Sequence, residues 1–110
     1  QGLAVAQLNV GRMLADGMGT RKDEALARQY FEKAASRGDN RASFNLAMME
    51  EKKKNYMGAY QWYELSTRDG MLDNKVITLS EGRKTALAAN LTQEQIRQAR
   101  DRADRWIQAQ

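Results

Sequence analysis

The sequence contains no cysteine, no histidine and no proline among its 110 residues. The first two absences exclude a disulfide framework, a thiolate nucleophile and a metal site built on thiolate or imidazole ligands. The lack of proline removes the residue that most strongly interrupts helices. Together with a charged content of 29%, it favours a nearly all-helical chain with solvated outer faces. No apolar run approaches the roughly 20 residues of a membrane-spanning helix, so we expect no membrane insertion.

The same absences leave little material for catalysis. The commonest general bases and nucleophiles are missing, and none of the serines at positions 36, 43, 66 and 80 is followed by a lysine three residues later. We therefore expect no catalytic residue, no metal and no cofactor. An enzyme that relies on a carboxylate cluster in a closed pocket is the third of three hypotheses about function.

The charge balance is only mildly basic. Eighteen lysines and arginines against fourteen acidic residues give a formal net charge of +4, which is weak evidence for nucleic acid. Binding of an acidic polymer is the second hypothesis, and it requires an affinity that falls steeply with added salt. Glu50 and Glu51, with the run Lys52-Lys53-Lys54 that follows them, are expected to form a solvated helix end, and the alternative for the lysines is a contact with an acidic partner.

A short stretch of the chain occurs twice. Residues 29–38 carry the aromatic pair Tyr30-Phe31 and close on a glycine, and residues 61–70 repeat both features 32 residues later. The segment before each copy also repeats, because residues 6–13 match residues 42–49 at a spacing of 36. A repeat of this length with helical spacing inside it predicts stacked helix pairs, which usually bind other macromolecules.

Apolar spacing and capping residues place the helices. Asp23, then Asp39 or Asn40, and later Thr92 are the expected N-caps, and Thr92 and Gln95 have the spacing of a capping box. Glycines 17 and 19 predict a turn after the first helix. The expected helices cover residues 3–15 and 23–38, start again at 39 or 40, run from about 56 to 69, continue after 73 to near 90, and resume after 92.

Further positions strengthen the repeat pattern. In the first unit they are Ala6, Val10, Gly11, Gly17, Gly19, Asp23, Ala27, Lys33, Ala34, Ala35 and Gly38, and in the second they are Ala42, Leu46, Ala47, Ala59 and Gly70. With the aromatic pairs, they resemble the Sel-1-like repeat, a bacterial and eukaryotic relative of the tetratricopeptide repeat. The resemblance implies a right-handed α-solenoid of about three antiparallel helix pairs. It also implies a non-enzymatic adaptor or scaffold that binds a partner protein or peptide through its concave groove. An immunity or inhibitor protein for a bacterial toxin is the alternative, because some relatives have that role.

We expect a single repeat domain over residues 1–110. Its units are about 3–38, 39–70, and a degenerate third unit with a capping helix over 71–110, placed in the C-terminal part of a longer array. The helix over residues 3–15 is apolar almost all round, so another surface should cover it, either a preceding repeat or the second copy of a homodimer. The chain opens on Gln1, which favours a periplasmic or exported protein, or a fragment of a longer one.

The first helices of stacked pairs line the concave face. If Ala6, Val10 and Leu14 point to the core, then other positions of the first helix face the groove, as do their counterparts 36 residues later. Methionines there can adapt to a partner helix, although core filling is the alternative for them. The predicted partner-binding residues are Asn9, Arg12, Asp16, Asn45, Met48, Met49 and Lys52.

Overall fold

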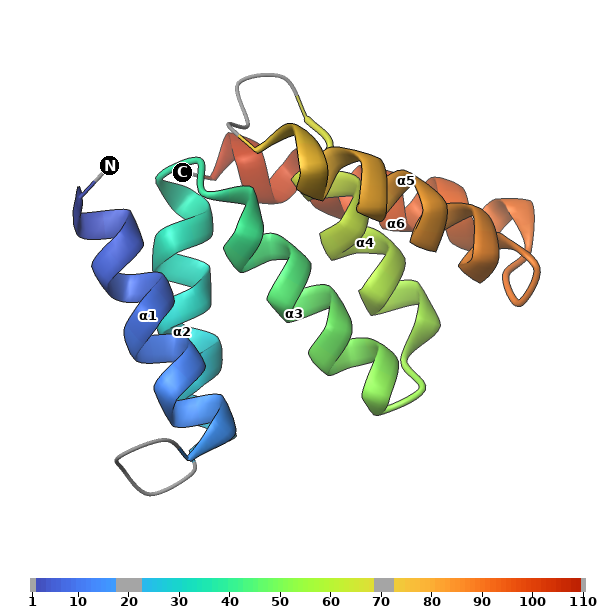
Figure 1. Ribbon diagram of the computed structural model, residues 1–110. Coiled ribbons are helices and arrows are strands. Elements are labelled where there is room, and N and C mark those ends of the chain that lie inside the picture. The colour runs from blue at the N-terminus through green and yellow to red at the C-terminus, as the bar shows by residue number, and fades with distance from the viewer. Residues whose placement is uncertain (1, 18–22, 69–72, 110) are drawn as a thin grey trace.

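The computed structural model describes residues 2–17, 23–68 and 73–109. These residues form no strand and six helices: α1 (Gly2–Asp16), α2 (Glu24–Ser36), α3 (Asn40–Lys52), α4 (Tyr56–Ser66), α5 (Asn74–Ala88) and α6 (Gln93–Gln108). Figure 1 shows α1 beside α2 and α3 beside α4, as two antiparallel pairs. The expected all-α repeat solenoid is thereby confirmed. None of the helices in the described ranges is long and apolar enough to cross a membrane.

Side chains cap the first turn of each helix from α2 to α6. The N-caps are Asp23, Asp39, Asn55, Asp73 and Thr92. At Thr92 the predicted capping box is confirmed, because Gln95 N donates to Thr92 Oγ1 over 3.1 Å and Thr92 N donates to Gln95 Oε1 over 2.9 Å. Gly17 follows α1 with a φ of 73°, as the turn prediction requires, whereas Gly19 and Gly70 lie outside the described residues.

The rotation of α1 about its axis differs from the prediction. Leu14 is buried as predicted, but Ala6 and Val10 are exposed rather than in the core. The physical reason is the ring of Phe31 from α2, which lies so close to Gly11 that a Cβ built on this glycine would be 2.7 Å from Phe31 Cε1. The side of α1 that packs on α2 is therefore the one that carries Gly11. Its buried positions are Ala4, Leu8, Gly11 and Leu14.

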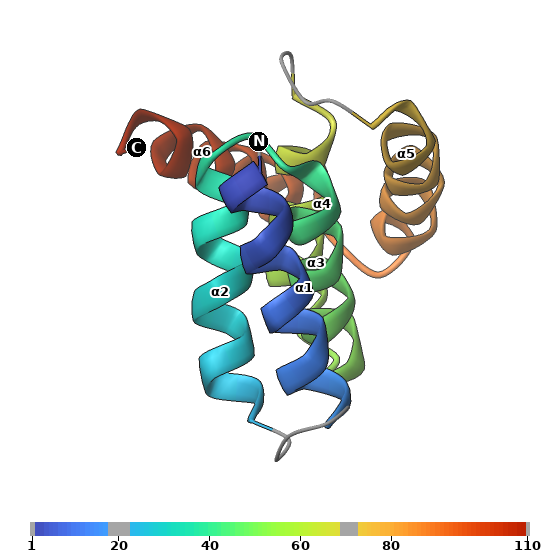
Figure 2. The ribbon, with the colours of Figure 1, turned by 60° about the vertical axis from the view of Figure 1, so that its left-hand side comes forward.

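The third helix pair packs differently from the first two. Figure 2 shows α5 and α6 on opposite sides of α4, and both pack mainly against α4 rather than against each other. Glu64 of α4 lies between them, with its Oε1 atom 2.9 Å from Lys84 Nζ of α5 and 3.6 Å from Arg100 Nε of α6. A single carboxylate thus links three helices. The third unit covers α4 from two sides instead of stacking as a hairpin.

Two further contacts hold this end of the array. Trp106 of α6 meets Trp62 of α4 edge to face, with ring centroids 5.5 Å apart. Asn40 is fully buried, and its Nδ2 donates to the carbonyl oxygens of Ser66 over 3.1 Å and Asp73 over 3.0 Å. The amide therefore joins the starts of α3 and α5 to the end of α4. Because a buried amide needs these partners, the contact favours one arrangement of the helices.

Candidate functional site

Five of the seven predicted partner-binding residues line one pocket. It lies between α1, α2 and α3, has a volume of about 310 Å³, and receives Asp16 from the end of α1. The full lining is Ala15, Asp16, Glu24, Phe31, Asn45, Met48, Met49, Lys52 and Lys53. The predicted position of the groove is therefore a real hollow, although the register assumed for α1 was wrong.

A second hollow lies on the other side of α3, toward α5. Its volume is about 370 Å³, and its lining is Phe44, Met48, Glu51, Lys52, Tyr63 and Arg83. Met48 and Lys52 line both hollows, so they form a ridge between them. We call the two hollows and this ridge the concave surface. Met48 keeps 38% of its area exposed and Lys52 is exposed as well, so a partner on the concave surface would meet both.

Aromatic side chains form the floor of the second hollow. The rings of Phe44 and Tyr63 meet edge to face, with centroids 5.4 Å apart and an interplanar angle of 65°. Tyr63 Oη donates to Glu51 Oε1 over 2.9 Å, and burial raises the pKa of Tyr63 to about 12. Arg83 of α5 pairs with the other oxygen of the same carboxylate. Glu51 therefore joins α3, α4 and α5 along the edge of the hollow.

The two glutamates at the end of α3 are structural, so the prediction that Glu50 and Glu51 form a solvated helix end is wrong. Glu50 is 8% exposed, pairs with Arg28 of α2, and accepts a hydrogen bond from Asn55 Nδ2 over 2.6 Å. Gly58 makes room for this cluster, because a Cβ there would lie 3.1 Å from Glu50 Oε2.

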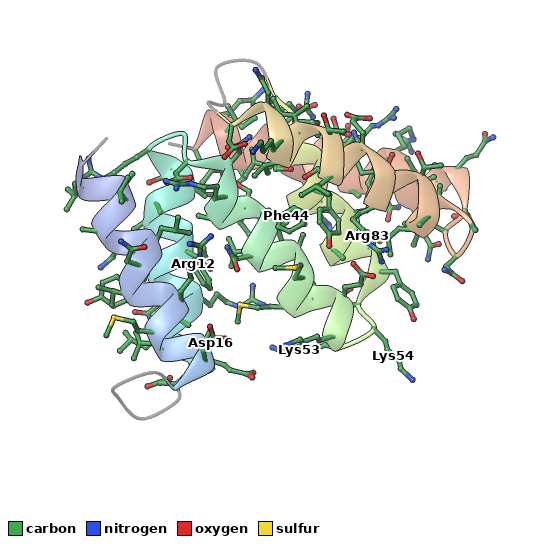
Figure 3. The ribbon with its side chains drawn as sticks, viewed as in Figure 1. Arg12, Asp16, Phe44, Lys53, Lys54 and Arg83 are labelled. Carbon is green, nitrogen blue, oxygen red and sulfur yellow. The ribbon has the colours of Figure 1, made fainter. Side chains whose placement is uncertain are left out.

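The lysines that follow these glutamates are exposed, as predicted for a solvated end. Figure 3 shows Lys53 and Lys54 at the lower end of α3, with Lys53 on the side toward Asp16 of α1. Lys54 lies in the left-handed region with a φ of 62°, where the chain turns toward α4. Lys52 and Lys53 line the first hollow together with the carboxylates of Asp16 and Glu24. This end of the concave surface therefore carries both positive and negative charge.

Asn9 and Arg12 are the two predicted residues that do not line either hollow. Both are exposed on α1, and Figure 3 shows Arg12 on the side of α1 that faces α3. Asn45 lines the first hollow, but its Nδ2 already donates to the carbonyl oxygen of Arg41 over 2.8 Å. The ridge residues are thus better placed than the asparagines to contact a partner.

Sequence reasoning missed the aromatic floor and Arg83. The repeat contained a signal for the floor, because Phe44 stands where the first unit has Leu8, and Tyr63 where it has Phe31. The second unit therefore places two rings where the first has Leu8 and one ring. Arg83 had no such signal, since the third unit has lost the repeat pattern. Across the ranges 2–17, 23–68 and 73–109, the acidic residues do not form a group that could hold a metal ion.

Comparison with known families gives two matches to one model, described as the Sel1 repeat. The first covers residues 4–39 and the second covers residues 40–71, together more than half of the chain. The chain belongs to the Sel1 repeat family. The boundary between the matches falls between the Asp39 cap and the first residue of α3, where one helix pair gives way to the next. No curated protein and no solved structure matches the chain.

Membership of the Sel1 repeat family limits the function in a general way. Sel1 repeats are non-catalytic scaffolds that generally mediate protein–protein interaction. Both matched units contribute to the concave surface, the first through the end of α1 and the second through α3 and Tyr63. Arg83 comes from α5, so the edge toward α5 lies outside the two matched repeats.

Proposed function

We propose that this chain is an interaction module that binds a protein partner through the concave surface. One observation carries the proposal: Met48 and Lys52 of the second Sel1 repeat are both exposed, on a ridge between two hollows. An unbranched methionine side chain adapts to the shape of an apolar group, and a lysine beside it meets a carboxylate. The whole chain acts as one such module, with α5 completing the surface.

The chemistry of the concave surface favours a partner segment with apolar and acidic residues. The second hollow has an apolar floor of Phe44 and Tyr63, which suits one aliphatic or aromatic side chain. Lys52 and Lys53 line the first hollow, where they could pair with acidic residues of the same partner segment. Asp16 and Glu24 also line the first hollow, so the acidic residues of the partner segment would contact the lysines and lie away from these two carboxylates.

A site-specific photo-crosslinker at position 48 tests the proposal. Met48 and Leu26 are each 38% exposed, but Leu26 lies on α2 outside both hollows, so position 26 is a matched control. In extracts of the cells that produce the protein, we expect a discrete protein adduct at position 48 and none at position 26. Equal labelling at the two positions, or adducts at neither, would reject the concave surface as the binding site.

A triple variant then separates binding from stability. Asn45→Ala, Met48→Ser and Lys52→Glu together should abolish the adduct partner's binding and leave the melting temperature nearly unchanged, because the two ridge side chains are exposed and Asn45 is bonded only to its own helix. Arg102→Glu on α6 is the charge-change control. Undiminished binding by the triple variant contradicts the proposal. If the triple variant still binds, and its affinity falls steeply as salt is added, the ligand is an acidic polymer instead.

A further inference from the structure

Helix α5 is held against the rest of the molecule largely by polar contacts. Two of its four buried side chains, Ser80 and Lys84, are polar, and Leu87 is its one residue in the hydrophobic core. By contrast, α6 buries two alanines in that core and packs Trp106 against it. Since apolar burial supplies most of the free energy that holds helices together, α5 is the helix of the third unit that should separate more easily.

Buried polar groups that contact α5 also have partners outside α5. Ser66 Oγ of α4 lies 2.5 Å from Ser80 Oγ, but it also donates to the carbonyl oxygen of Tyr63 over 2.6 Å. The side-chain amide of Asn40 donates to the carbonyl oxygen of Asp73, at the start of α5, and also to that of Ser66. If α5 moved away, neither side chain would lose its last hydrogen bond, which is the usual penalty for separating a polar contact.

The ion pair between α4 and α5 is shared in the same way. Glu64 of α4 contacts Lys84 of α5 over 2.9 Å, and it also has Arg68 Nη2 at 3.3 Å and Arg100 Nε at 3.6 Å. Lys84 in turn has Glu81 of its own helix at 3.2 Å. Breaking a buried ion pair is costly when it leaves one charge without a counterion. Here both charges keep an opposite charge after α5 has left.

Glu51 connects the position of α5 to the concave surface. One of its carboxylate oxygens accepts a hydrogen bond from Tyr63 Oη, and the other pairs with Arg83 of α5. Glu51 and Arg83 both line the second hollow, next to Lys52. When α5 leaves, the hollow loses the wall formed by Arg83, and the charge of Glu51 is no longer neutralised. A carboxylate in this place repels the acidic partner segment that Lys52 would attract.

We propose that α5 is a releasable helix that regulates the concave surface. Docked on α4, it completes the site for an apolar and acidic segment, and released, it leaves a wider and more acidic surface that binds this segment weakly. The release is a property of the chain alone, whereas its effect on binding rests on the function proposed above. Because coupling between two equilibria is reciprocal, the bound segment should hold α5 in its docked position by the same factor.

Hydrogen exchange followed by NMR tests the release. A separated α5 has only 15 residues and would be a marginal helix in water, so its amides exchange whenever it leaves α4. We expect exchange in the interior of α5 to be at least about tenfold faster than in α4. Ser66→Cys with Ser80→Cys provides a lock, because the two hydroxyl oxygens are 2.5 Å apart and the chain has no other cysteine. Oxidation of this pair should slow exchange in α5 to the rate in α4, and the reduced form of the same protein is the matched control.

Two exchange results would overturn the inference. If α5 and α4 exchange at the same rate in the native chain, α5 is an integral part of the domain. If α5 exchanges quickly but the disulfide does not slow it, its amides open by local unwinding while the helix stays docked.

Leu87→Ala tests the effect of release on binding. This change removes the core contact of α5 at a residue outside both hollows. With the photo-crosslinker at position 48, we expect at least about fivefold less adduct from this variant, and recovery of the adduct when the oxidised cysteine pair is added. Exchange in α4 is the folding control, and an α4 that opens together with α5 would show that α5 is not separable.

The two proposals fail in different ways. An adduct yield that Leu87→Ala leaves unchanged, although exchange in α5 has accelerated, overturns the regulatory role of α5. Absence of the adduct from every form of the chain, the locked one included, rejects the concave surface as the binding site, and with it the regulation of that site. The exchange rates still decide in that case whether α5 is releasable.

Discussion

Replacing Gly11 by alanine tests the contact that sets the rotation of α1. The new Cβ would lie 2.7 Å from Cε1 and 2.8 Å from Cδ1 of Phe31, against an ordinary carbon–carbon contact of about 3.5–4.0 Å. The ring is 1% exposed, so it has no free space into which to turn. The variant must therefore separate α1 from α2 by roughly 1 Å or force the ring off its rotamer.

The expected magnitude follows from two opposing effects. Overpacking a well-packed core costs about 1–3 kcal/mol. Alanine in a helix interior returns about 0.5–1 kcal/mol relative to glycine. We therefore expect Gly11→Ala to lower the free energy of unfolding by about 1–2 kcal/mol, with a melting temperature lower by about 4 °C for each kcal/mol.

Urea denaturation measures this change, with Gly82→Ala as the matched control. A Cβ on Gly82 of α5 meets nothing within 4 Å, so that variant should gain about 0.5–1 kcal/mol from helix propensity alone. In the Gly11→Ala background, Phe31→Leu should recover part of the loss, giving a coupling of about 1 kcal/mol in a double-mutant cycle. If Gly11→Ala stabilises the protein as much as Gly82→Ala, the close approach of α1 and α2 is refuted.

Three further predictions concern other parts of the fold. The pKa of Tyr63 is raised to about 12 from an ordinary value of 10, so its phenol contributes stability that is fully present below pH 10 and lost as the pH rises toward 12. In urea titrations, the difference in unfolding free energy between the native chain and Tyr63→Phe should shrink across that window. A difference that is independent of pH would contradict the shift. Lys54→Gly should raise the free energy of unfolding by about 1 kcal/mol, because φ of 62° is strained for lysine, and no gain would argue against the left-handed turn. Thr92→Ala should cost about 1 kcal/mol and reduce helicity in α6, where amide exchange near Gln95 should accelerate; unchanged exchange would mean that the capping box is dispensable.

The candidate site shows which residues the repeat spacing could predict and which it could not. The spacing of 36 residues placed Asn45, Met48 and Lys52 on one side of α3, and these residues do line a hollow. On α1, Asn9 and Arg12 lie outside both hollows, and Ala6 and Val10 are exposed instead of in the core. The failure has a physical cause: a helix that is apolar on nearly every side does not reveal which side faces its neighbour.

Charged residues near the site were harder to interpret from local pattern. Glu50 and Glu51 resemble an ordinary solvated helix end when only their neighbours Lys52–Lys54 are considered. Their partners are Arg28 and Arg83, 22 and 32 residues away, so no local pattern predicts the pairing. An acidic side chain can be buried when the fold supplies a cation and hydrogen bonds, and only the packed helices provide these.

The sequence by itself determined the helix pairs, the boundary near Asp39, the capping box at Thr92 and the family, because each depends on residues within about one repeat of one another. Tertiary structure alone decided which side of α1 is buried, where Glu50 and Glu51 find their partners, and that α5 and α6 separate around α4. These features depend on contacts between side chains from different helices. The energies of these contacts depend on packing and on charged partners from other helices, as in the contact of Gly11 with Phe31, and not on local sequence.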